Sequence, residues 1–411
     1  MTMADTALKY LCDTYGNEVL YDADGKPSIF VRHPKMKSSE FDPILPNHTH
    51  PAFIVGNTED DTVLIGKYMS SELTANGTQY SLPNMPPRVT ITHDAALEKM
   101  RAFGGRVSGL TIADHGLLVL LAHKLGISAS HGNNNYSADY RAGTHYTLNA
   151  AVTAGTKRIF RGWEYECLVD HTTSANLLPV NSPGYWEKGK QVGGVPVPTQ
   201  FKSGNDYSGY NTLTGSGPID WYFHDDPAME ADIQGNAAEQ VYGFRLVNCE
   251  IQILPNNNAA DPSANVSASS SDWRAILPHD SDDGYDLVAP GTAGTVHYAW
   301  LNSKLTLVAR ALDDAEFDNI SRSTAYKNIA VDSTTLPYVP SILYELGLCP
   351  LPSTTVDGMI YVMFTKDERV ARRGGYYAGA PGAGVAGLRC YHARAIADVD
   401  YGSRPRSRPN P

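Results

Sequence analysis

The chain has 411 residues, of which 42% are hydrophobic and 19% charged, and a formal net charge of −11. This acidic balance argues against a protein that coats nucleic acid or an anionic membrane, and the abundant Gly, Pro and Tyr indicate a folded, loop-rich chain rather than a disordered one. No apolar run approaches the roughly 20 residues of a membrane-spanning helix, and the first residues lack the pattern of a signal peptide. Five scattered cysteines without a CxxC pair favour reduced thiols over a disulfide frame or a zinc site.

In chain order, residues 1–27 are expected to form a leader or attachment segment. Short apolar runs flanked by turn residues then predict strands within 29–33, 51–56 and 62–70. Two helices follow, one starting near Thr92 or Asp94 and ending at Gly104, the other from about Thr111 to Leu125. The second is apolar on most sides and is therefore expected to be buried.

The second half of the chain predicts strands separated by long loops. Residues 133–216 are rich in Gly, Asn, Ser and Tyr and are expected to form long ordered loops, and a second insertion covers about 256–355. Alternation around Asn248 predicts a hairpin, and an apolar run predicts a strand over 359–364. The fold class predicted from these elements is α+β, with two helices, short antiparallel strands and extensive loops.

Several stretches occur in an order that matches one family. They are "FVRHPKM", "HPAFIVG", "LIGKYMS", "GLTIADHGLLVLLAHKLG", "GNNNYS", "LTGSGPIDW", "WRAILP", "GLCPLP", "ERVARRGG" and "YGSRPRSR". In this series, from about residue 28 to 411, the chain resembles the phage and prophage variable proteins of diversity-generating retroelements. That family shares a C-type-lectin-like fold with the formylglycine-generating (sulfatase-modifying-factor) group, so the resemblance implies this fold for residues 28–411.

The resemblance also implies that residues 376–402 are a variable region, copied from a template whose adenines are mutagenised. An asparagine codon changed in its first two bases cannot give Lys, Glu, Gln, Met or Trp, and residues 376–402 contain none of these. Large polar and aromatic residues lie there among small ones with no helix or strand period. The residues expected to contact a ligand are Tyr376, Tyr377, Ala378, Ala380, Arg389, Tyr391, His392, Ile396, Asp398, Asp400 and Tyr401.

In this family the variable side chains emerge from a rigid scaffold, which fixed glycines such as Gly374, Gly375, Gly382, Gly384 and Gly402 would help to hold. Tyr and Arg suit such a surface because they give large contact areas and many hydrogen bonds at low entropic cost. The resemblance therefore implies a receptor-binding protein without enzymatic activity, displayed at the tip of a phage tail fibre and contacting a host surface protein or glycan. The alternative is a bacterial surface-displayed or secreted variable protein.

Several partners follow from the same resemblance. The N-terminal segment is expected to contact other tail or virion proteins, and the chain is expected to form a homo-oligomer, with a trimer as one option. Neither nucleic-acid binding nor membrane insertion is expected. Arg404, Arg406 and Arg408 suggest a basic tail, but pairing with carboxylates of the same chain, or solvation, is favoured over nucleic acid.

Other clusters of polar residues are candidate sites of chemistry. His48, His50 and His131 could hold a metal, and residues 279–286 carry oxygen ligands that could bind structural Ca²⁺, but no metal or other cofactor is predicted. Glu164, Glu166, Cys167, Asp170 and His171 are a possible nucleophile-and-base set without an oxyanion element. A formylglycine-generating-type oxidase is the least favoured reading, because Cys390 stands without the second cysteine that those relatives use.

Overall fold

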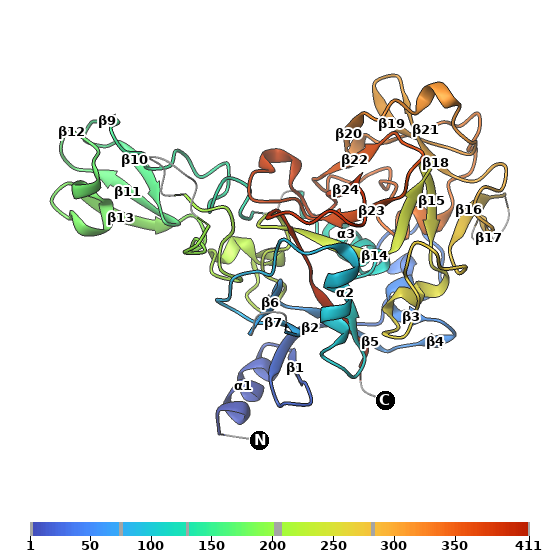
Figure 1. Cartoon of the computed structure of the whole chain (residues 1–411), viewed down its shortest axis with the longest axis horizontal. Coiled ribbons are helices and arrows are strands. Elements are labelled where there is room, and N and C mark those ends of the chain that lie inside the picture. The colour runs from blue at the N-terminus through green and yellow to red at the C-terminus, as the bar shows by residue number, and fades with distance from the viewer. Residues whose placement is uncertain (1–2, 74–76, 129–130, 201–207, 281–283, 410–411) are drawn as a thin grey trace.

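The structure is a computed structural model that describes residues 3–73, 77–128, 131–200, 208–280 and 284–409 (Figure 1). It combines a few helices with several sheets, so the predicted α+β class is confirmed. None of the helices in these ranges is both long and apolar enough to cross a membrane. Figure 1 shows a body that carries most strands and a smaller lobe, labelled β9 to β13, that projects from it.

The first sheet joins the two ends of the chain. Its five strands lie in the order β1-β2-β5-β26-β8. Their bounds are Asn17–Tyr21, Pro27–Pro34, Thr62–Gly66, Pro405–Ser407 and Val107–Gly109, respectively. Within the predicted leader, helix α1 (Met3–Thr14) precedes β1, which pairs antiparallel with β2. This part of the leader therefore packs into the body.

The second sheet contains twelve strands in the described residues and forms most of the body. Its main path is β20-β22-β24-β23-β14-β15-β18-β19-β21, with β25 on β14, β16 on β15 and β17 on β16. The bounds from β14 to β25 are Ala238–Val247, Glu250–Ile253, Arg274–Pro278, Tyr285–Val288, His297–Leu301, Lys304–Val308, Ser321–Ala325, Ala330–Val331, Met359–Met363, Arg369–Arg373, Leu388–His392 and Tyr401–Gly402. Strands β16 to β21 lie within the predicted insertion 256–355 and join this sheet.

The hairpin predicted around Asn248 is confirmed by β14 and β15. Asn248 and Cys249 have φ values of 52° and 60°, as the two central residues of a type I′ hairpin turn require. The strand predicted over 359–364 is confirmed by β22. Four short strands form two further hairpins, β3 with β4 and β6 with β7. Their bounds are Ile54–Val55, Thr58–Glu59, Ser70–Glu72 and Gln79–Ser81.

Both predicted helices are present, as α2 (His93–Arg101) and α3 (Ile112–Lys124). The Thr92 side chain accepts a hydrogen bond from the Ala95 amide and caps α2. Helix α3 is buried along most of its length, as expected. The expectation of two helices is wrong, because the described residues also contain α1 and α4 (Ser341–Glu345). Helix α1 lies in the segment expected to be a leader, and the five residues of α4 are too few to establish a helical period.

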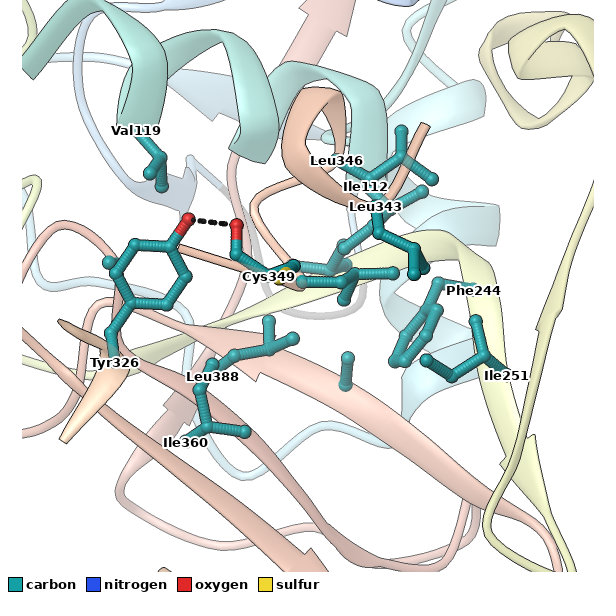
Figure 2. Close-up of a cluster of buried hydrophobic side chains, with 14 of the residues drawn as sticks. Ile112, Val119, Phe244, Ile251, Tyr326, Leu343, Leu346, Cys349, Ile360 and Leu388 are labelled. Atoms are coloured by element: carbon teal, nitrogen blue, oxygen red, sulfur yellow. Dashed lines mark hydrogen bonds between the residues drawn. The ribbon is translucent and has the colours of Figure 1, made fainter. Parts of the chain in front are cut away.

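The main core lies between α3, α4 and the large sheet (Figure 2). Phe244, Ile360 and Leu388 from three strands are buried there with Leu343 from α4. Helix α3 approaches α4 closely at Gly116, where a Cβ atom would lie 1.8 Å from the Glu345 carbonyl oxygen. Gly116 therefore fixes the spacing of the two helices.

Residues 133–216, called the arm below, contain more regular structure than predicted. The expectation of loops alone is wrong here, because short strands form a three-stranded sheet, β10-β11-β13, and the pair β9-β12. Strands β9 to β13 cover Ala151–Val152, Lys157–Phe160, Trp163–Cys167, His171–Thr172 and Trp186–Gln191. The arm has its own small core, in which the Tyr146 ring meets Phe160 and Trp186 edge-on.

Candidate functional site: an aromatic and arginine face

Residues 376–402, which we call the variable segment after the expectation that the resemblance gives, lie where β23, β24 and β25 meet the start of β14. Strand β23 pairs antiparallel with both β14 and β24, while β25 pairs in parallel with β14. Residues 374–387 and 393–400 connect these strands. The variable segment is therefore anchored at each of its strands in a sheet that the rest of the chain builds.

Glycines allow the first connection to pass close to its neighbours. Gly374 and Gly375 both have a φ of 81°, and a Cβ atom on Gly375 would lie 2.5 Å from the Ala383 Cβ. Gly235, just before β14, has a φ of 76°, and its Cβ would lie 2.2 Å from the Asn133 carbonyl oxygen. No other residue fits these positions without moving the backbone.

A buried ionic cluster lies under the variable segment. Arg373 Nη1 donates to Glu239 Oε2 at 2.8 Å, and Arg404 Nε donates to Glu239 Oε1 at 2.8 Å. Arg404 also donates to the carbonyl oxygens of Gly66 and Ala231. All three charged side chains are at most 2% exposed. Because both oxygens of one carboxylate are occupied by fixed cations, this cluster ties β14, β23 and the C-terminal segment into one position.

The two following arginines are also paired inside the molecule. Arg406 forms an ion pair with buried Asp114 at 3.1 Å, and Arg408 donates to both oxygens of Asp60 at 2.6 and 2.9 Å. Of the two alternatives favoured for the C-terminal arginines, solvation and pairing with carboxylates of the same chain, the structure shows the pairing. The C-terminal tail is thus part of the buried ionic support beneath the variable segment, which we call the frame.

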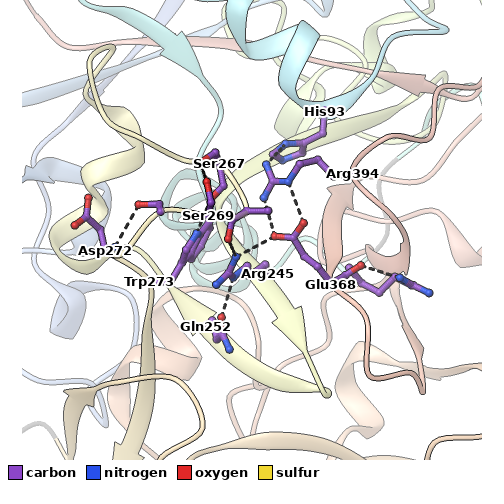
Figure 3. A network of polar contacts seen from close by, with 12 residues as sticks. His93, Arg245, Gln252, Ser267, Ser269, Asp272, Trp273, Glu368 and Arg394 are labelled. Carbon is purple, nitrogen blue, oxygen red and sulfur yellow. Dashed lines mark hydrogen bonds and ion pairs between the residues drawn. The ribbon is translucent and has the colours of Figure 1, made fainter.

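Arg394 fixes the second connection (Figure 3). It donates from Nε and Nη2 to the two oxygens of Glu368, at 3.0 and 2.9 Å, and from Nη1 to Asp94 at 2.7 Å. Glu368 also accepts from Arg245, whose guanidinium lies 4.4 Å from the Trp273 ring centre. Residues 393–400 are therefore held to β14 and α2 by charge-assisted hydrogen bonds.

Arg389 lies at the centre of the aromatic residues. Its guanidinium carbon is 4.1 Å from the Tyr376 ring centre and 5.4 Å from that of Tyr361, and Nη1 is 3.7 Å from Asp400 Oδ2. Arg389 is only 5% exposed. It therefore supports Tyr376 from beneath through a cation–π contact, worth about 1 kcal/mol in such settings.

Tyr377 joins the variable segment to the arm. Its ring centre is 5.6 Å from that of Tyr136 and 5.1 Å from that of Tyr210, both on the arm, and its carbonyl accepts from the Tyr136 amide at 2.7 Å. The Tyr377 amide donates to the Asn236 carbonyl at 3.0 Å. The buried Asn236 side chain also bonds the backbone of Thr212 in both directions. The arm and the variable segment therefore share one anchor.

A further group of aromatic rings extends from Tyr391, whose hydroxyl accepts a hydrogen bond from Arg389 Nη1 at 3.4 Å. Tyr391 is 4.2 Å from His392 and 5.9 Å from Tyr361, measured between ring centres. His392 in turn lies 5.2 Å from Tyr401, whose ring is covered by the buried guanidinium of Arg372 at 4.0 Å. The half-buried rings of Tyr391 and His392 therefore pack above the buried side chains of Tyr401 and Arg372.

Burial determines the charge of two side chains in the variable segment, Asp400 and His392. It raises the pKa of Asp400 to about 6, an effect that the nearby Asp398 reinforces and Arg389 opposes. Burial, together with Arg372 and Arg389, lowers the pKa of His392 to about 4. At neutral pH the face therefore combines a neutral imidazole with a carboxylate that becomes protonated in mildly acidic solution.

The structure brings most of the predicted contact residues together. Tyr376, Tyr377, Arg389, Tyr391, His392, Asp400 and Tyr401 form a continuous set of ring and charge contacts. Ile396 and Asp398 are exposed on the second connection, and Ala378 and Ala380 are half-buried on the first, where Ala380 begins a single 3₁₀ turn. The expectation that all these side chains emerge at the surface is wrong for Arg389 and Tyr401, which are 5% and 2% exposed because they support their neighbours.

Sequence reasoning missed four residues that contact the predicted set. Tyr136 and Tyr210 come from the arm, Tyr361 from β22 and Arg372 from β23. Tyrosine is abundant in the whole chain, so its density gives no local signal. We call the side chains of Tyr376, Tyr377, Tyr391 and His392, together with Tyr136, Tyr210 and Tyr361, the aromatic face.

The three histidines that could hold a metal have other partners in the structure. His48 and His50 both contact Glu345, whereas His131 lies 3.3 Å from Asp139. Burial lowers the pKa of His50 to about 4. In the ranges that the structure describes, no three His, Cys, Asp or Glu side chains gather as metal ligands. The acidic segment 279–286 lies partly outside the described residues, since 281–283 are not among them.

Cys167 and His171 do come together on the arm. The Cys167 Sγ atom lies 3.6 Å from His171 Nδ1, but the cysteine is fully buried and Nδ1 is 2.7 Å from the Val169 carbonyl oxygen. A nucleophile needs access to a substrate, which this thiol lacks.

Comparison with known proteins gives no further assignment. No protein-family model matches the chain, and no curated protein matches its sequence.

Proposed function

We propose that this chain is a receptor-binding protein that recognises a protein or glycan on a cell surface through the aromatic face. On this proposal it has a C-type-lectin-like fold and belongs with the variable proteins of diversity-generating retroelements, displayed at the tip of a phage tail fibre. The proposed family and the proposed location at a tail-fibre tip both come from the sequence resemblance.

The observation that carries the proposal is the layering of the variable segment. Buried, charge-paired arginines and tightly packed glycines form its base, while half-buried aromatic rings and exposed residues form its outer layer. Rigid aromatic side chains bind with little loss of rotamer entropy, and Arg389 holds one of them in place. Such a layer supports recognition of a surface without any chemical step.

The cysteine of the variable segment supports this choice over an oxidase. Cys390 is fully buried within the main core, and burial raises the pKa of its thiol far above the ordinary value. All five cysteines are buried and free. Thiol chemistry requires an accessible thiolate.

The experiment uses fluorescently labelled chain and a panel of bacterial strains. Wild-type protein should bind at least one strain, and the double variant Tyr376→Ala/Tyr377→Ala should bind that strain at least about tenfold more weakly, as loss of aromatic hot-spot residues does. Tyr338→Ala removes a tyrosine that is 57% exposed and outside the aromatic face, and it should bind as the wild type does. Equal binding by the double variant and the wild type would reject the proposal.

A further inference from the structure

A second candidate site is a pocket between the arm, the body and the first connection of the variable segment. Its volume of about 260 Å³ approaches the roughly 300–1,000 Å³ of clefts that hold small molecules, so it has room for one ring-sized unit. The residues that line it include Tyr140 and Arg141 from the arm, Lys327, Asp357 and Met359 from the body, and Pro381 from the variable segment.

The pocket adjoins the aromatic face. Met359 lines the pocket and Tyr361 belongs to the aromatic face, and both lie on the half-buried side of β22, because alternate residues of a strand share one side. Gly382 of the variable segment packs against both, since a Cβ atom there would lie 2.8 Å from the Tyr361 hydroxyl and 3.4 Å from Met359 Cγ. One larger ligand can therefore contact the pocket and the aromatic face together.

Hydrogen bonds to the backbone fix the walls of the pocket. The side-chain oxygen of Asn134 accepts from the Tyr140 amide at 2.7 Å, and its carbonyl accepts from the Ala380 amide at 3.0 Å. One residue thus holds the arm and the variable segment together. On the opposite wall, the Asp357 carbonyl accepts from the Ala386 amide at 3.1 Å. A pocket that is already formed loses little entropy when a ligand binds.

The charged groups of the pocket are accessible and balanced. Lys327 and Asp357 form an ion pair at 3.2 Å, and their side chains are 46% and 41% exposed. Arg141 donates from Nε and Nη2 to the two oxygens of Asp139, each at 2.7 Å, and its guanidinium carbon lies 5.0 Å from the ring centre of Tyr140, which is 40% exposed. Each of these two cations is thus paired with a carboxylate, so neither an anion nor a cation gains a net attraction there.

We propose that this pocket binds one neutral sugar unit of a cell-surface glycan, which rests on the proposed receptor-binding function. A hydroxyl both donates and accepts, so neighbouring hydroxyls of a sugar can donate to Asp357 and accept from Lys327 without leaving either charge unpaired. The apolar C–H face of the sugar ring would pack on the exposed part of the Tyr140 ring. An acidic sugar is disfavoured because its charge would face that of Asp357.

The test measures binding of the full chain to neutral oligosaccharides of hexoses and N-acetylhexosamines, and to matched oligosaccharides that end in a uronic acid. Wild-type protein should bind at least one neutral oligosaccharide more tightly than its acidic counterpart. Asp357→Ala should weaken that binding at least about tenfold, the factor expected for one hydrogen bond to a charged group. The same variant should strengthen binding of the acidic counterpart, because it leaves Lys327 without its carboxylate.

Two further variants complete the test. Tyr140→Ala should also weaken binding of the neutral oligosaccharide, whereas Asp314→Ala, which removes another exposed Asp–Lys pair, should leave it unchanged. Thermal melts report whether each variant is folded. Wild-type protein that binds no neutral oligosaccharide, that prefers the acidic one, or whose binding survives Asp357→Ala would overturn the sugar pocket. Receptor binding fails separately, because it is judged by the loss of binding to whole cells in Tyr376→Ala/Tyr377→Ala.

Discussion

At the scale of single residues, buried arginines determine how the variable segment is held. Arg373, Arg404 and Arg406 are each at most 1% exposed, and each is paired with a buried carboxylate. Breaking such a pair leaves an uncompensated buried charge, which costs more than the pair itself contributes. The frame should therefore be sensitive to changes far from the aromatic side chains.

The variant Glu239→Gln tests directly whether the buried arginine–carboxylate pairs stabilise the fold. The variant removes the one carboxylate that two buried arginines share, so the free energy of unfolding should fall by about 3–5 kcal/mol. Asp314→Asn is the matched control, because Asp314 pairs with Lys366 where both side chains are largely exposed, and such pairs contribute less than about 1 kcal/mol. Urea unfolding followed by circular dichroism compares the two. Similar losses in both variants would refute the structural role of the cluster.

Asp400 gives a pH-dependent prediction. Its folded-state pKa of about 6 exceeds its ordinary value of 3.8, so the folded protein binds more protons than the unfolded one between these values. The contribution of Asp400 to the free energy of unfolding should therefore fall as the pH rises from about 4 to 6, by about 3 kcal/mol. The difference in stability between wild type and Asp400→Asn should show this fall. A difference that is constant with pH would contradict it.

Sequence predicted part of this residue-scale picture. The acidic composition of the chain disfavoured nucleic acid as the partner of Arg404, Arg406 and Arg408, but it left pairing with carboxylates and solvation as alternatives. The burial of Arg389 and Tyr401 could not be predicted, because their partners Tyr376, Tyr361 and Arg372 meet them only through strand pairing. Local patterns carry no information on contacts of that kind.

At the scale of elements, the sequence predicted those that carry their own local signals. Helices α2 and α3 have a capping threonine and a helical apolar pattern, and the hairpin of β14 and β15 has an asparagine turn. Strand β26 pairs with β5 more than 300 residues earlier in the chain, as Arg406 opposite Ile65 shows. The strands of the arm are short and rich in polar residues. Sequence periodicity could reveal neither the long-range pairing of β26 with β5 nor the short polar strands of the arm.

Asn236→Ala tests how the arm is joined to the variable segment. The change removes the side chain that bonds Asn133 and the Thr212 backbone, leaving buried groups without partners at a cost of about 1–3 kcal/mol each. Amide hydrogen exchange should become faster in residues 133–138 and 209–212. Asn265→Ala, which removes an exposed side chain that bonds only a nearby amide, should leave both segments unchanged. Faster exchange spread evenly over the body would contradict a local anchor.

At the scale of the whole molecule, the arm and the body meet at the aromatic face. Tyr136 and Tyr210 from the arm pack on Tyr377 from the body, so the binding surface that we propose is shared by both. The resemblance of the chain to a known family implied that residues 376–402 contact a ligand, whereas the contribution of the arm was visible only in the structure. The proposal for recognition consequently includes fixed residues as well as replaceable ones.

The central claim is that a stable frame carries a replaceable outer layer. It is tested most directly by measuring protease resistance across two displayed libraries, one randomised at Tyr376, Tyr377, Ile396 and Asp398, the other at Glu239, Arg373 and Arg404. The account predicts that most members of the first library resist protease as the wild type does, while most members of the second are cleaved. Widespread cleavage in the first library would show that the outer side chains are needed for folding, and would contradict the account.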